Sequence, residues 1–176
     1  MLLKMYAFRR GSLAAAAVAL LIGLYPARAS ATATTLAPVL AATTWLGGRD
    51  AAPNLRGKVV LVDVFTFECI NCTRITPNLR ALWRGRARDF TIVGVHTPEV
   101  PAYQGRRPYL TAMLRRSAIG WPVAVDNDAR IWNAYGVDAW PTQLVFDRRG
   151  RLRARVVGDS QDAHLDATVR ALLAER

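Results

Sequence analysis

The chain has 176 residues, of which 24 are basic and 13 acidic, so its formal net charge is +11. A basic balance of this size favours nucleic acid or an anionic membrane as partner. The arginines, however, are scattered singly and in pairs, without a basic run or an aromatic platform, which argues against nucleic-acid binding. The length suffices for one domain with a hydrophobic core and is too short for two.

The first 29 residues are typical of an export signal. Residues 4–10 carry three basic side chains and no acid, and an apolar run follows over residues 13–24. Ala27 and Ala29 then supply the small residues that a signal peptidase reads, so cleavage before Ser30 is expected. The alternative is an uncleaved membrane anchor, although the apolar run is shorter than the roughly 20 residues that span a bilayer. We therefore expect an extracytoplasmic (periplasmic) protein.

The mature chain divides by composition into two parts. Residues 30–44 are rich in alanine and threonine and carry no charge, which predicts a flexible tether. The folded domain is then expected over residues 45–176. Within it, residues 59–65 form a continuous β-branched and apolar run, typical of a central strand that is covered on both faces. Only Asp63 interrupts this run.

Beyond Cys69 the apolar period becomes helical, with Ile75, Leu79 and Leu82 on one face, so the cysteines lie at a strand-to-helix turn. The later pattern predicts a strand over 90–95, a helix over 109–116, a strand over 123–125, a helix capped by 126–128, a hairpin of 143–146 with 152–157, and a final amphipathic helix through 165–173. Strands that alternate with helices and end in a hairpin predict an α/β fold with a mixed sheet.

The chemistry centres on Cys69 and Cys72, which enclose Ile70 and Asn71 and are the only cysteines in the chain. A disulfide that closes so small a loop restricts the unfolded chain by only about 2 kcal/mol, so a structural staple is a poor use of this spacing. A cysteine at the first turn of a helix meets unpaired N–H groups and the positive end of the helix dipole, which favour its thiolate. Cys69 is therefore predicted to be the nucleophile and Cys72 the resolving thiol.

The resolving thiol must lose a proton before it attacks, and two acids are candidates for accepting it. Asp63 lies inside an apolar strand, where desolvation should raise its pKa toward neutrality. The alternative is an edge position from which the side chain reaches solvent. Glu99 follows the second predicted strand at the sheet edge where ligands gather in α/β proteins, and its alternative is a solvated loop acid.

Residues 60–72 resemble the active-site segment of the thioredoxin superfamily. The Cys-Ile-Asn-Cys sequence, together with residues 94–99, is similar to that of TlpA-like redoxins and of thioredoxin domains fused to membrane electron carriers. Residues 121–128 and 132–136 match as well, so the resemblance covers residues 44–175. It implies a thioredoxin fold, in which helices flank a mixed central β-sheet.

Residue by residue, the resemblance implies that Cys69 attacks, Cys72 resolves and Asp63 is the buried acid. Pro77 matches the proline that kinks the family's active-site helix. Glu99 matches an acid that extracytoplasmic thioredoxins of cytochrome c maturation carry near their cysteines.

The resemblance also selects a substrate-binding loop. Pro141 matches the proline that family members hold in cis opposite the cysteines, where the backbone of Trp140 pairs with the bound chain. The residues alone leave Pro122 as an equal candidate for the cis bond. The sequence departs from the family at Glu68, where many relatives have tryptophan or threonine, and a negative charge there would oppose thiolate formation at Cys69.

The function implied is that of a thiol:disulfide oxidoreductase with a redox-active Cys69–Cys72 disulfide and no cofactor or metal. The family and the expected location favour a reductant, which draws electrons from a membrane thiol carrier. It would pass them to oxidised cysteines of exported proteins, with apocytochrome c as one example. We expect a monomer that binds no nucleic acid.

Two other functions remain open. Residues 66–69 resemble the Thr-x-x-Cys motif of peroxiredoxins, in which the threonine helps to position the peroxide, although Val62 stands where their proline would be. A copper- or zinc-binding module is the second alternative, because Cys69, Cys72, His96 and His164 are possible ligands. Only the two cysteines are clustered in the sequence.

Overall fold

The computed structural model describes residues 32–47, 52–84 and 88–175, so the predicted signal peptide lies outside the described residues. In chain order the elements are α1 (Ala37–Leu40), β1 (Trp45–Leu46), β2 (Val59–Phe65), α2 (Ile70–Trp83), β3 (Phe90–His96), α3 (Pro101–Gln104), α4 (Arg107–Arg116), β4 (Val123–Val125), α5 (Arg130–Ala134), β5 (Thr142–Phe146), β6 (Leu152–Val157) and α6 (Asp162–Ala174). Within the described ranges, no helix combines the length and the apolar character that a membrane crossing requires.

The strands form one sheet in the order β1-β4-β3-β2-β5-β6. The parallel pairs are β2 with β3 and β3 with β4, whereas β5 pairs antiparallel with β2. The strands at the two edges, β1 and β6, are also antiparallel to their neighbours. The predicted mixed α/β sheet is therefore confirmed, with β2 at its centre.

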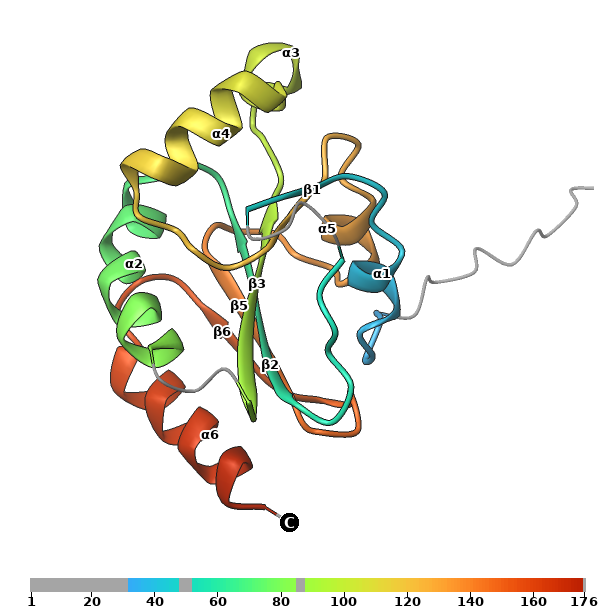
Figure 1. Ribbon diagram of the computed structural model, residues 1–176, viewed down its shortest axis with the longest axis vertical. Coiled ribbons are helices and arrows are strands. Elements are labelled where there is room, and N and C mark those ends of the chain that lie inside the picture. The colour runs from blue at the N-terminus through green and yellow to red at the C-terminus, as the bar shows by residue number, and fades with distance from the viewer. Residues whose placement is uncertain (1–31, 48–51, 85–87, 176) are drawn as a thin grey trace, which may run out of the picture.

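Helices cover both faces of the sheet, with α2, α4 and α6 on one side and α1 and α5 on the other (Figure 1). Successive residues of β2 divide between these two layers. Leu61 and Phe65 pack in the core beneath α2 and α6, whereas Val62 and Val64 pack in the core of the opposite layer. Asp63 shares the parity of Leu61 and Phe65, so its side chain lies on the face that α2 covers.

The segment predicted to be a flexible tether is packed against the domain where the structure describes it. Val39 of α1 is fully buried, and Leu36 is also part of the core. The backbone carbonyl of Thr35 accepts a hydrogen bond from the hydroxyl of Tyr135 at 2.9 Å. Buried apolar side chains and backbone hydrogen bonds together hold this uncharged segment, so the packed domain begins before the expected boundary at residue 45.

One further segment differs from expectation, and the helix that follows it agrees. The loop expected between the second strand and the next helix contains the short helix α3, and α4 already begins at Arg107. The helix expected after residues 126–128 begins at Arg130. The carboxylate of Asp126 nevertheless caps it, because it accepts the backbone N–H groups of Ile131 at 2.9 Å and of Trp132 at 3.0 Å.

Candidate active site

The two cysteines lie where β2 passes into α2, and they differ in accessibility. Cys69 is the N-cap of α2 with an extended backbone, and its sulfur accepts the backbone N–H of Cys72 at 3.4 Å. Cys69 is partly exposed, whereas Cys72 is only 5% exposed, and both are free thiols. One sulfur is therefore open to a partner and the other is shielded, as a nucleophile and a resolving thiol require.

Asp63 lies beneath this turn as a buried carboxyl that is only 4% exposed. Burial raises its pKa to about 7, although a hydrogen bond from the side-chain amide of Gln143 opposes the rise. Burial, together with the negative charge of Asp63, also raises the pKa of the Cys72 thiol. A carboxyl that titrates near neutrality beside the resolving thiol is suited to accept its proton and return it. The structure places Asp63 in the interior, so the edge alternative is wrong.

The partner of Asp63 is a residue that the sequence analysis missed. Gln143 is 1% exposed, and its Nε2 donates to Asp63 Oδ1 at 3.0 Å. The two residues are directly opposite each other in the antiparallel pair of β2 and β5. The sequence predicts strand β5 but not its register against β2, so no signal in the chain pointed to this contact.

The loop that leads into β5 lies next to Cys69. The peptide bond between Trp140 and Pro141 is cis. The backbone carbonyl of Trp140 accepts the Cys69 thiol at 3.7 Å, and Pro141 itself is buried. The structure therefore brings Cys69, Trp140 and Pro141 together, and the cis bond lies at Pro141 rather than at Pro122.

Glu68 is directed away from this loop, toward α4. One carboxylate oxygen accepts the hydroxyl of Thr66 at 2.8 Å, and the other accepts the hydroxyl of Tyr109. Thr66 is fully buried. The hydroxyl of Thr66 thus donates to Glu68, whereas the peroxidase alternative requires it to position a peroxide.

His96 ends β3 beside the active-site turn as a fully buried imidazole. The rings of Phe65 and Phe67 flank it, with centroid separations of 5.5 Å and 5.2 Å. Neither ring nitrogen has a hydrogen-bond partner among the described residues. Burial lowers the pKa of His96 to about 4, although the charge of Glu68 opposes the shift, so the ring is neutral at pH 7.

The remaining candidates, Glu99 and His164, are both exposed. Glu99 is exposed just after β3, and among the described residues no hydrogen bond or ion pair joins it to Cys69 or Cys72. His164 is exposed on α6. The described ranges contain no group of three or more histidine, cysteine or acidic side chains that could hold a metal ion.

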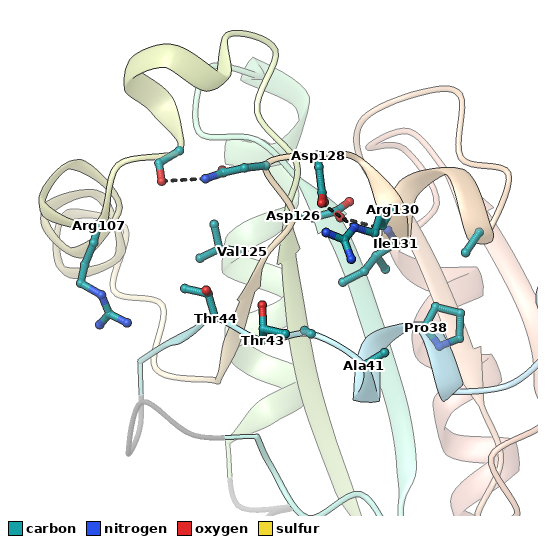
Figure 2. A pocket seen from close by; sticks show the side chains of 14 residues that line it. Pro38, Ala41, Thr43, Thr44, Arg107, Val125, Asp126, Asp128, Arg130 and Ile131 are labelled. Carbon is teal, nitrogen blue, oxygen red and sulfur yellow. Dashed lines mark hydrogen bonds and ion pairs between the residues drawn. The ribbon is translucent and has the colours of Figure 1, made fainter.

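Two cavities lie near the carboxyl ends of the parallel strands, but only one of them reaches the cysteine pair. A cavity of about 560 Å³ lies between α2 and α4 and is lined by Phe67, Cys72, Arg80 and Arg116 among others. A second cavity, of about 530 Å³, lies between α1, α5 and the start of α4 and contains no cysteine (Figure 2).

The cationic groups of the second cavity are already engaged. Arg107 donates to the carbonyl of Trp45 at 3.3 Å, and Arg130 forms an ion pair with Asp128. Figure 2 shows Arg107 at one side of the cavity and the Arg130–Asp128 pair at the other. The cavity that borders Cys72 is therefore the one that belongs to the thiol site.

Comparison with known proteins agrees with this geometry. Residues 57–152 match the model of a family described as thioredoxin-like. The chain is 34% identical over 148 residues to the protein SUPPRESSOR OF QUENCHING 1 of Arabidopsis thaliana. This match covers 81% of this chain and 14% of the relative. It is 32% identical over 137 residues to the protein DipZ of Mycobacterium bovis, which covers 74% of this chain and 19% of the relative. The chain thus spans less than a fifth of the length of these two relatives.

Among solved structures, the fold is similar to that of a thiol-disulfide isomerase from Corynebacterium glutamicum. The TM-score is 0.66 at 27% sequence identity, and the match covers 77% of this chain and 94% of that one. The expected thioredoxin fold, with helices on both faces of a mixed sheet, is confirmed.

Proposed function

This chain belongs to the thioredoxin-like family, and we propose that its cysteine pair exchanges a dithiol for a disulfide with cysteines of exported proteins, acting as a reductant. The observation that carries the proposal is the asymmetry of the pair. Cys69 is accessible at the start of α2, while Cys72 is buried close to an acid with a raised pKa. One solved structure that is similar to this chain is a thiol-disulfide isomerase, which agrees with this chemistry.

In the first step the Cys69 thiolate attacks one sulfur of a substrate disulfide. A mixed disulfide forms, and the other substrate sulfur leaves as a thiolate, which takes up a proton. The backbone N–H of Cys72 already points at the Cys69 sulfur and stabilises its negative charge before the attack. The backbone of Trp140 lies next to Cys69 and is positioned to pair with the substrate chain.

In the second step Cys72 attacks the Cys69 sulfur of the mixed disulfide. Its proton passes to Asp63, the intramolecular disulfide forms, and the second substrate sulfur leaves as a thiolate. Two electrons have then moved from the Cys69–Cys72 pair to the substrate. Gln143 holds the carboxyl of Asp63 through a hydrogen bond, so the proton acceptor is fixed in place.

The location and the partners complete the proposal. The basic and apolar start of the chain supports export, so we place the domain outside the cytoplasm, anchored to the membrane if the signal is retained. A membrane thiol carrier would return electrons to the oxidised pair. The substrates would be oxidised cysteines of exported proteins, with apocytochrome c as one candidate. The protein would act as a monomer. Glu99 would lie at the rim of its active site.

The reduction potential of the cysteine pair tests this proposal. The protein is equilibrated in glutathione or dithiothreitol buffers, and its dithiol and disulfide forms are counted after acid quenching. A potential of about −270 mV supports a reductant. A potential of about −120 mV would make the pair an oxidant and overturn the proposed direction of electron transfer. Failure to form the disulfide reversibly would contradict thiol exchange altogether.

A further inference from the structure

We propose that the anchored carboxylate of Glu68 sets the reduction potential of the cysteine pair, and that Tyr109 is the positioning residue that keeps this charge on the α4 side of the turn. The inference rests on the proposed function, since it concerns how strongly the pair acts as a reductant. Glu68 directly precedes the attacking cysteine, and its two carboxylate oxygens are each held by a separate hydroxyl.

The two side chains of this turn point to different neighbours. The sulfur of Cys69 faces the carbonyl of Trp140, in the loop that leads into β5. The carboxylate of Glu68 faces Tyr109 of α4, a helix on the same layer as α2 (Figure 1). The charge is therefore close to Cys69 along the chain but is restrained from approaching its sulfur.

Tyr109 is itself held in a defined position. Its ring packs edge-on against Tyr103, with centroids 6.0 Å apart, while the hydroxyl donates to Glu68. Burial and the hydrogen bond to the Glu68 carboxylate raise the pKa of Tyr109 to about 12, so the hydroxyl remains a donor throughout the physiological range. The Tyr109 hydroxyl can therefore donate to Glu68 throughout the neutral pH range.

The direction of the effect follows from charge. Glutathione disulfide oxidises the protein dithiol to a disulfide and is itself reduced to two glutathione thiols. Only the reduced form of the protein can therefore carry a thiolate at the attacking cysteine. A neighbouring carboxylate disfavours that thiolate, and it therefore destabilises the reduced form and makes the pair a stronger reductant. The ionisable groups on the elements packed around the turn include Asp63 on β2, His96 on β3, Tyr109 on α4 and Arg74 on α2. Arg80 and Arg116 also line the cavity that borders Cys72, and as cations they favour a thiolate rather than oppose it.

These neighbours do not substitute for Glu68. His96 is neutral at pH 7, and Asp63 is buried beneath Cys72. Arg74 forms an ion pair with Asp159 at 3.3 Å. Glu68 is thus the exposed acid that adjoins Cys69 in the chain. Glutamine in its place removes the charge and keeps one oxygen that can accept the hydroxyl of the buried Thr66.

The test compares reduction potentials at pH 8 in glutathione buffers for the wild type and for Glu68→Gln. The variant should raise the dithiol-to-disulfide ratio in a given buffer about tenfold, which corresponds to a potential about 30 mV more positive. Asp128→Asn removes the same charge at an exposed site beside Arg130 and should change the ratio less than twofold. Equal shifts in both variants, or a shift below twofold in Glu68→Gln, would overturn the proposal.

The role of Tyr109 is tested by a double-mutant cycle. Tyr109→Phe frees the carboxylate to approach Cys69, so it should lower the dithiol-to-disulfide ratio about threefold. In the Glu68→Gln background the same substitution should have no effect. A change that persists without the carboxylate, or no change in either background, would refute the positioning role. If the wild type cycles reversibly while these shifts are absent, this inference fails and the proposed function stands.

Discussion

Replacing Asp63 by asparagine should reveal a free-energy cost that the wild-type domain bears at neutral pH. The asparagine side chain would keep the shape of the aspartate and an oxygen that can accept the hydrogen bond from Gln143. The substitution removes the capacity to ionise and replaces the other carboxyl oxygen by an NH2 group, whose cost does not depend on pH in this range. Because burial raises the pKa of Asp63 to about 7 from its ordinary value of 3.8, the folded state holds the proton more tightly than the unfolded state does.

The magnitude follows from proton linkage. A difference of about three pH units between folded and unfolded pKa values corresponds to about 4 kcal/mol. Below about pH 4 the carboxyl is protonated in both states and costs nothing. As the pH rises from 4 to 7, the unfolded state ionises first, so wild-type stability falls, and the full cost is present above pH 7. The stability difference between Asp63→Asn and wild type should therefore grow with pH across this window.

His96 must be included in the interpretation because its effect has the opposite sign. Burial lowers the pKa of His96 from 6.5 to about 4, so the unfolded state binds the proton more readily. Stability is therefore lost as the pH falls from 6.5 to 4, by about 3 kcal/mol. The two buried groups nearly cancel in the wild type, whose stability should vary little over this range. In Asp63→Asn the His96 effect is no longer offset by Asp63, and stability should rise with pH.

The assay is urea unfolding followed by tryptophan fluorescence between pH 4.5 and 7.5, with a phosphine reductant present to keep both cysteines reduced. The free energy of unfolding is taken from each transition at matched slope. A difference between variant and wild type that stays constant over the whole pH range would refute the reasoning. It would mean that Asp63 ionises equally readily in the folded and unfolded states.

Three further predictions concern single positions. Removing the imidazole in His96→Leu should stabilise the domain at pH 4.5, and the part of this gain that comes from ionisation should vanish above pH 6.5, as urea unfolding at the two pH values will show. Burial would raise the pKa of Asp147, but hydrogen bonds from Arg151 and Arg149 outweigh it and hold the pKa at about 2. Asp147→Asn should therefore cost about 1 kcal/mol at pH 7, and this cost should disappear as the pH falls below about 2. In Gly94→Ala the new methyl group would lie 2.9 Å from a Val123 methyl, so thermal unfolding should show a loss of about 1–3 kcal/mol.

Much of the fold could be predicted because its signals are local. The apolar run of β2 and the helical period of α2 each lie within one segment, and together they locate Cys69 and Cys72 at the turn between them. The strand period also puts Asp63 on one face of β2, and its burial follows once both faces of that strand are covered. For β2 and α2, the pattern within each segment was therefore enough to predict where the cysteines and Asp63 lie.

The contacts that complete the site are long-range, and the sequence did not predict them. Gln143 reaches Asp63 only because the register of two strands 80 residues apart places them opposite each other. Tyr109 reaches Glu68 across 41 residues because α4 covers the same face of the sheet as α2 (Figure 1). Residues 32–44 carry no charge and are rich in alanine and threonine, a composition that predicts a tether. The structure nevertheless buries Val39 against the domain, a contact that composition does not reveal.

Trapping of the mixed disulfide tests the central claim most directly. The Cys72→Ser and Cys69→Ser variants are each mixed with oxidised glutathione, quenched in acid and weighed by mass spectrometry. Cys72→Ser should accumulate one glutathione bound at Cys69, because the resolving sulfur is missing, while Cys69→Ser should react far more slowly through its buried Cys72. Equal labelling of the two variants, or no adduct on Cys72→Ser, would contradict the division of labour between the two cysteines.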